Sequence, residues 1–98
     1  MVAMPDEKTL DKMESLLNIA SDYTRLKIMY SLSEGEKNVS EIVKEVGASQ
    51  SLVSHQLKVL RKANLVETHK EGTKVFYSLA DEHVIALLNV THEHVSEK

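Results

Sequence analysis

The amino-acid sequence predicts a mainly α-helical domain that contains one β-hairpin. Apolar residues recur at helical spacing over most of the chain, and this spacing changes to a period of two between residues 66 and 79. The three glycines fall between the periodic segments. The length of 98 residues and the mass of 11.0 kDa fit a single domain, residues 1–98, with one small core.

The composition narrows the class of protein. Hydrophobic residues make up 42% of the chain and charged residues 28%, which is typical of a soluble globular domain. The chain has no cysteine, which excludes disulfides, a thiolate nucleophile and sulfur ligands for metals. No apolar run approaches the roughly 20 residues that span a bilayer, and the N-terminus lacks the pattern of a signal peptide. We therefore expect a cytoplasmic protein with no membrane partner.

Helical spacing indicates the first two elements. The first helix is expected from about Thr9 to Ile19, and Asp22 is placed to cap the second, which Gly35 closes. The apolar stripes consist of Leu10, Met13, Leu16, Leu17 and Ala20 on the first helix, and of Leu26, Met29, Tyr30 and Leu32 on the second.

The next two segments predict a pair of helices joined by a tight turn. Asn38 and Glu41 have the spacing of a capping box, and the helix that they begin should end at Gly47. Ser49 is well suited to cap the following helix. The apolar face of that helix carries, in order, Val53, Leu57, Leu60 and Asn64.

A hairpin and a last helix complete the chain. Residues 66–70 and 73–79 alternate in polarity on either side of Glu71-Gly72, which predicts a β-hairpin with its turn at these two residues. Asp81 then restarts helical spacing. The predicted order is α-α-α-α-β-β-α. Helices joined by a tight glycine turn and followed by a hairpin, the wing, are the arrangement of a winged helix-turn-helix.

The charge is distributed unevenly along the chain. The net charge is −3, but residues 49–75 carry five Lys or Arg against two Glu, and both ends of the chain are acidic. A solvated charged face is the simplest interpretation of such a segment. Its coincidence with the helix-turn-helix favours double-stranded DNA as the partner.

The helix that begins after Ser49 sorts its polar side chains by type. Short hydrogen-bonding residues occupy its N-terminal half, where a recognition helix approaches base edges, and cations follow where phosphates are reached. The candidate DNA-binding residues are Gln50, Ser51, Ser54 and His55 for bases, and Lys58, Arg61, Lys70 and Lys74 for phosphates. The alternative is that these side chains only cap and solvate the helix.

Three segments resemble one family of regulators. The hairpin and the stretches DYTRLKIM (22–29) and SQSLVSHQLK (49–58) are similar to the ArsR/SmtB family of metal-responsive bacterial and archaeal repressors. The resemblance covers nearly the whole chain. It implies a homodimer joined through its first and last helices, which represses metal-homeostasis genes and leaves its operator when metal binds.

Four potential metal ligands flank the last helix: Asp81 and His83 at its start, His94 and Glu97 at its end. The eleven steps between the two histidines span about 16 Å, so one chain cannot close the site. At about 100° per residue, the same eleven steps return to within about 20° of the starting direction, so one stripe carries His83, Leu87, Val90, His94 and Glu97. An antiparallel partner helix would create two symmetric sites, each with two imidazoles and two carboxylates.

This pattern is similar to the last-helix zinc site of the SmtB-type sensors, and all four positions match. The donor set suits Zn(II), with Co(II) able to substitute. Family members that sense arsenic, cadmium or lead commonly use cysteines, so these effectors are not expected here. His92 lies nine residues from His83, about 180° around the helix, and should point away from the site.

The sequence and the family resemblance also lead us to expect a set of dimer-interface residues, a relay from the metal to the recognition helix, and a symmetric operator. The interface residues are Leu10, Met13, Leu17, Leu87 and Val90. By resemblance to the family, a zinc-bound His94 should donate its second ring N–H to the backbone near Asn64. The operator should be an imperfect palindrome that matches the two-fold symmetry of the dimer.

Two other functions are compatible with parts of the sequence. An enzyme would need a catalytic motif, but the chain has no Gly-x-Ser-x-Gly elbow and too few glycines for a phosphate-binding loop, so no enzyme is predicted. The second alternative is a winged-helix regulator that binds DNA constitutively or responds to a signal other than metal. Such a protein would use its last helix only to dimerise.

Overall fold

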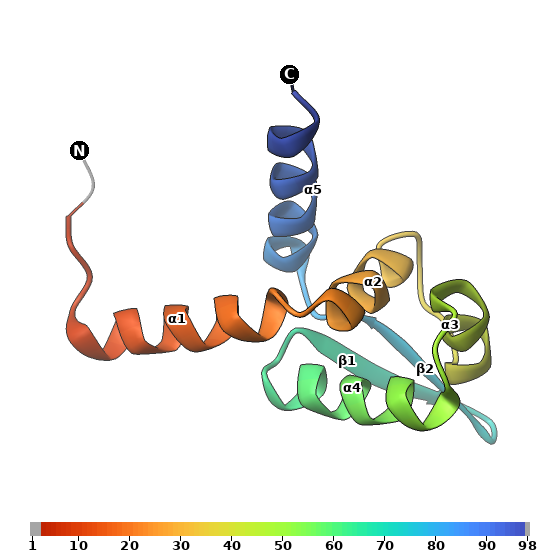
Figure 1. The fold of residues 1–98 in the computed structure, drawn as a ribbon. Coiled ribbons are helices and arrows are strands. Elements are labelled where there is room, and N and C mark those ends of the chain that lie inside the picture. Colours follow the sequence, from red (N-terminus) through yellow and green to blue (C-terminus); the bar gives the residue numbers. More distant parts are fainter. Residues whose placement is uncertain (1–2, 98) are drawn as a thin grey trace.

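The computed structural model describes residues 3–97, which form five helices and one hairpin (Figure 1). The elements are α1 (Glu7–Ala20), α2 (Tyr23–Leu32), α3 (Val39–Val46), α4 (Gln50–Lys62), β1 (Val66–Glu71), β2 (Lys74–Leu79) and α5 (Glu82–Ser96). This order is the predicted one. A compact body is formed by α2, α3, α4 and the hairpin, and α1 and α5 project from it. Within residues 3–97, no helix combines the length and apolar character needed to cross a membrane.

Side-chain caps determine where three of the helices begin. Asp22 accepts a hydrogen bond from a backbone N–H in the first turn of α2 at 3.0 Å. Asn38 and Glu41 form the reciprocal capping box of α3, each bond measuring 2.9 Å. Ser49 accepts from the first turn of α4 at 3.1 Å. All three predicted caps are confirmed.

Three element boundaries differ from the prediction. α2 ends at Leu32 with Ser33 as its C-cap, three residues before Gly35. α1 begins at Glu7 rather than near Thr9, because Asp6 caps its first turn. The hairpin loop consists of residues 72–73 rather than Glu71-Gly72, because Glu71 pairs with Lys74 across the strands. The glycine of this loop has a φ of 65°, which suits the first position of a two-residue hairpin turn.

One hydrophobic core joins the body of the molecule to the start of α5. Its most completely buried side chains are Ile28, Met29, Ile42, Val53, Leu57, Leu60, Leu65 and Val66. Of the residues predicted on the apolar face of α4, Val53, Leu57 and Leu60 are confirmed as core residues, whereas Asn64 lies beyond the helix and is exposed. On α2, Ile28 is buried whereas Leu26 and Tyr30 are exposed, so the inner stripe of this helix is rotated from the predicted one.

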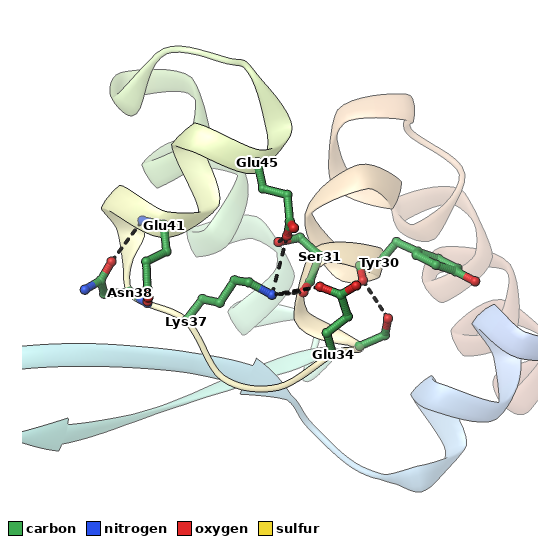
Figure 2. Close-up of polar contacts among 8 residues, drawn as sticks. Tyr30, Ser31, Glu34, Lys37, Asn38, Glu41 and Glu45 are labelled. Atoms are coloured by element: carbon green, nitrogen blue, oxygen red, sulfur yellow. Dashed lines mark hydrogen bonds and ion pairs between the residues drawn. The ribbon is translucent and has the colours of Figure 1, made fainter.

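Lys37 connects the wing to the helices, as Figure 2 shows for its side chain. Its backbone pairs with Tyr77 of β2 through two hydrogen bonds of 3.0 and 2.8 Å. Its ammonium donates to the carbonyl of Ser31 and lies 3.5 Å from Glu34 and 3.4 Å from Glu45. The hydroxyl of Ser31 donates to Glu45. One residue thereby ties β2 to both α2 and α3.

Candidate DNA interface and metal-ligand positions

One side of α4 faces the core, and the predicted base-reading residues lie on its exposed side. Gly47, at a φ of 76°, ends α3, and Ser49 caps α4 two residues later, so the turn between the helices is short. The core holds α4 from behind and leaves its outer side accessible. The predicted DNA-binding residues on this helix, all of them exposed, are Gln50, Ser51, Ser54, His55, Lys58 and Arg61.

The two predicted cations of the wing lie near its tip and are exposed. Lys70 stands opposite Val75, and Lys74 stands opposite Glu71. Because side chains alternate along a strand, this register places the two lysines on opposite faces of the hairpin. The wing therefore presents one cation on each side of its tip.

Lys44 is a further cation at this surface, which the spacing of motifs did not single out. It lines a hollow between α3 and α4 together with Gln50 and three residues of α3. The only sign of this cation in the sequence was a lysine on the helix that precedes the turn. Its proximity to the N-terminus of α4 depends on how α3 packs, which periodicity does not define.

The contact between Arg25 and Gln56 was also not predicted from the sequence. Arg25 of α2 donates from Nη1 to Oε1 of Gln56 on α4 at 2.8 Å, and both side chains are half-buried. They lie 31 residues apart in the chain. No local pattern connects them, so only the tertiary structure could reveal the contact.

The predicted metal ligands lie at the two ends of α5. Asp81 is the N-cap, and its Oδ1 accepts from the backbone N–H groups of His83 at 3.0 Å and Val84 at 3.2 Å. The side chain of His83 is 98% exposed, and His94 and Glu97 are exposed at the other end. Among residues 3–97 of one chain, no three His, Asp or Glu side chains lie close enough to hold a metal ion. A site built from these four residues needs a second chain.

The structure also shows where His92 and the predicted relay residues, His94 and Asn64, lie. The ring of His92 packs edge-on against Tyr30 of α2, with centroids 5.8 Å apart. Asn64 is the second residue beyond α4, after the C-cap Ala63; it has a φ of 62° and lines a hollow beside α1. Within the described part of a single chain, no hydrogen bond joins His94 to Asn64, and the relay stays a prediction.

The predicted interface residues form exposed apolar stripes on α1 and α5. The exposed fractions are 37% for Leu10, 47% for Met13, 51% for Leu17 and 62% for Val90. Leu87 is half-buried, and together with Leu17 it lines an apolar hollow between α1, α2 and α5. The two helices therefore offer adjoining apolar surface that their own chain does not cover.

Comparison with known proteins identifies the family. The model described as "Bacterial regulatory protein, arsR family" matches residues 22–68. The transcriptional repressor SmtB homolog of Synechocystis is 35% identical over 96 residues, which cover 95% of this chain and 73% of the relative. The chain belongs to the ArsR/SmtB family. The CadC homolog of Staphylococcus aureus, a cadmium resistance transcriptional regulatory protein, is 41% identical over 79% of this chain and 64% of its own length.

The fold of this ArsR/SmtB protein matches a solved structure over nearly its full length. A homodimeric winged helix-turn-helix DNA-binding domain from Mycobacterium bovis aligns with a TM-score of 0.85 at 29% identity, covering 99% of this chain and 92% of that one. The predicted winged helix-turn-helix is confirmed. Family membership also confirms that this ArsR/SmtB protein is a transcriptional regulator and not an enzyme.

Proposed function

We propose that this protein is a metal-responsive transcriptional repressor. Its metal-free homodimer binds a palindromic operator in the cytoplasm, and Zn(II) bound between the two α5 helices releases it. The proposal rests on the placement of Asp81, His83, His94 and Glu97, which are exposed at opposite ends of a helix whose apolar Val90 is exposed as well. The names of the SmtB and CadC relatives, a repressor and a cadmium resistance regulator, support this proposal.

The side chains of α4 suit sequence-specific recognition of DNA. The amide of Gln50 can bond adenine in a bidentate manner, and serine and histidine side chains can bond several base edges. Cations nearby can neutralise phosphates and orient the domain on the duplex. The exposed cations available for this are Lys44, Lys58, Arg61, Lys70 and Lys74.

The donor set on α5 fits Zn(II). Two imidazoles and two carboxylates are ligands that zinc accepts in a four-coordinate site, and Co(II) accepts similar donors. Asp81 caps α5 through Oδ1, so a metal could use its second oxygen while the cap persists. The apolar residues Leu87 and Val90 would pack between the paired helices and hold the two ends in place.

Zinc can release DNA only if the zinc-bound dimer disfavours the geometry that DNA requires. The proposed relay is the ring of His94, which would donate its free N–H to the backbone near Asn64. Asn64 is the second residue beyond the end of α4. A bond at this point would fix α4 relative to the α5 pair and alter the spacing of the two recognition helices.

A zinc titration of the chelator-treated protein tests the metal site. We expect uptake of about one zinc per chain, measured by competition with a chromophoric chelator. Asp81→Ala and His83→Gln should weaken zinc binding, whereas His92→Ala, a matched change on the same helix, should leave it unchanged. If the native protein takes up no zinc, or if only His92→Ala abolishes uptake, the proposed metal site is wrong and the signal is another one or absent.

A further inference from the structure

Arg25 connects three helices through one side chain. It is the third residue of α2, and its backbone N–H donates to the N-cap Asp22 at 3.0 Å. Its Nε donates to the carbonyl of Ile19 in the last turn of α1 at 2.8 Å, and its Nη1 donates to Gln56 of α4 at 2.8 Å. Because the guanidinium is planar and rigid, it holds α1 and α4 in a defined relation.

The bond to Ile19 is important because few other contacts orient α1. The last carbonyls of a helix lack partners within the helix, and the last turn of α1 has no cation of its own. Of residues 7–20, Ala20 alone is buried, and Ile19 packs against the core next to it. The rest of α1 extends away from the body (Figure 1). The direction of α1 is therefore set at its C-terminal end, where Arg25 binds.

The bond to Gln56 reaches the helix that carries the predicted base-reading residues. Gln56 is half-buried on the flank of α4 and directly follows the exposed His55. A hydrogen bond from a cationic donor is shorter and stronger than one between neutral groups. Any movement of Gln56 relative to α1 would move the outer side of α4 with it, because the helix is one rigid element.

We propose that Arg25 is a positioning residue that fixes α4 relative to α1 and thereby sets the half-site spacing that the dimer accepts. This inference rests on the proposed homodimer, in which α1 is part of the interface. Half-sites of such dimers lie about 10–10.5 base pairs apart, or multiples of this. One added base pair shifts a half-site by about 3.4 Å and rotates it by about 34–36°. A dimer whose two α4 helices are held in fixed positions would bind the altered operator more weakly. A dimer whose α4 helices can move relative to α1 would adjust to the altered spacing and lose less affinity.

The experiment uses the full chain and duplexes built from a half-site that the native protein selects from random DNA. Two inverted copies are placed at the selected spacing and at one base pair more and less, and fluorescence anisotropy gives the dissociation constants. The native protein should prefer its own spacing by on the order of tenfold. Arg25→Lys, which replaces two donor atoms by one, and Gln56→Leu, which removes the acceptor, should reduce this preference to about threefold or less.

Two matched variants control for charge and for substitution itself. Gln56→Glu retains an acceptor for Arg25, so it should keep the spacing preference although its charge weakens binding to every duplex. Lys27→Gln removes another cation from α2, one that lies 5.5 Å from the ring of Tyr23, and should also keep the preference. Thermal unfolding and sedimentation establish that each variant is a folded dimer.

The possible results separate this inference from the proposed function. If Arg25→Lys and Gln56→Leu keep the native preference, or lose affinity equally at all spacings, the positioning role is wrong. If the native protein selects no DNA or binds as a monomer, the proposed function itself is wrong. Should Arg25→Lys not fold, the comparison of Gln56→Leu with Gln56→Glu decides, because only Gln56→Glu retains an acceptor for Arg25 and its added charge acts equally at all spacings.

Discussion

At the residue scale, the cluster around Lys37 contains one carboxylate, that of Glu45, whose ionised form is favoured by its hydrogen bonds in the fold. The hydrogen bond from the Ser31 hydroxyl, and to a lesser degree the Lys37 ammonium, hold the pKa of Glu45 below its ordinary value of 4.5. A carboxyl whose pKa is depressed by folding stabilises the native state while it is ionised. This contribution is present above the unfolded-state pKa and is lost as the pH falls through the folded-state value.

Glu45→Gln tests this contribution. The variant should be less stable than the native protein at about pH 7, and the difference should shrink as the pH falls below about 4.5. Urea denaturation across this range measures it. Glu34→Gln is the matched control, since Glu34 also lies near Lys37 but is a more exposed partner (72% against 45%), and its effect should be smaller. A difference for Glu45→Gln that stays constant with pH would contradict the assignment.

Whether an interaction could be predicted from the sequence depends on how far apart its two residues lie along the chain. The caps Asp22, Asn38 and Ser49 were predictable because each acts on a backbone N–H three residues ahead. The bond between Arg25 and Gln56 was not, because its partners meet only after the helices have packed. The ligand positions on α5, and the partner helix that they would require, could be proposed from spacing, but the pattern of one chain does not define how two α5 helices would pack.

At the element scale, α4 and the wing should contribute differently to DNA binding. Gln50→Ala or Ser54→Ala should cost about 1–3 kcal/mol on the selected operator and little on random DNA, because base contacts specify sequence. Lys74→Ala should weaken both alike and reduce the salt slope by about 1, because phosphate contacts do not depend on sequence. Anisotropy on both duplexes at several salt concentrations measures these effects. If all three variants lose affinity equally for both duplexes, α4 does not read bases as proposed.

The periodicity of the sequence predicted which segments form helices and strands better than it predicted which side chains are buried. Every helix and the hairpin were expected from spacing, but an apolar stripe does not tell whether the same chain covers it. Leu26 and Tyr30 were expected on a stripe and are exposed, whereas Ile28 is buried. The hairpin turn was displaced by one residue because the pair of Glu71 with Lys74 extends both strands. Cross-strand pairing of this kind is not visible in the alternation of polarity.

At the scale of the whole molecule, the proposed homodimer would cover the exposed apolar residues of α1 and α5, and a small chain would gain stability from this burial. Val90→Asp would place two carboxylates near the two-fold axis, so sedimentation should detect a monomer that binds neither operator nor zinc. Val95→Asp is the matched control, because Val95 is equally exposed on α5 but lies on another side of the helix. This control should remain a dimer. A Val90→Asp protein that stays dimeric with native zinc affinity would show that the α5 helices do not pair as proposed.

The central claim is that zinc and operator DNA favour different geometries of one dimer. The most direct measurement is the operator affinity of the chelator-treated native protein, by anisotropy, without zinc and at saturating zinc. The proposal predicts a loss of about 5–150-fold, and linkage requires operator DNA to lower the affinity for zinc by the same total coupling free energy. His92→Ala should show the same loss. An operator affinity unchanged by zinc, in a protein that binds about one zinc per chain, would contradict the claim.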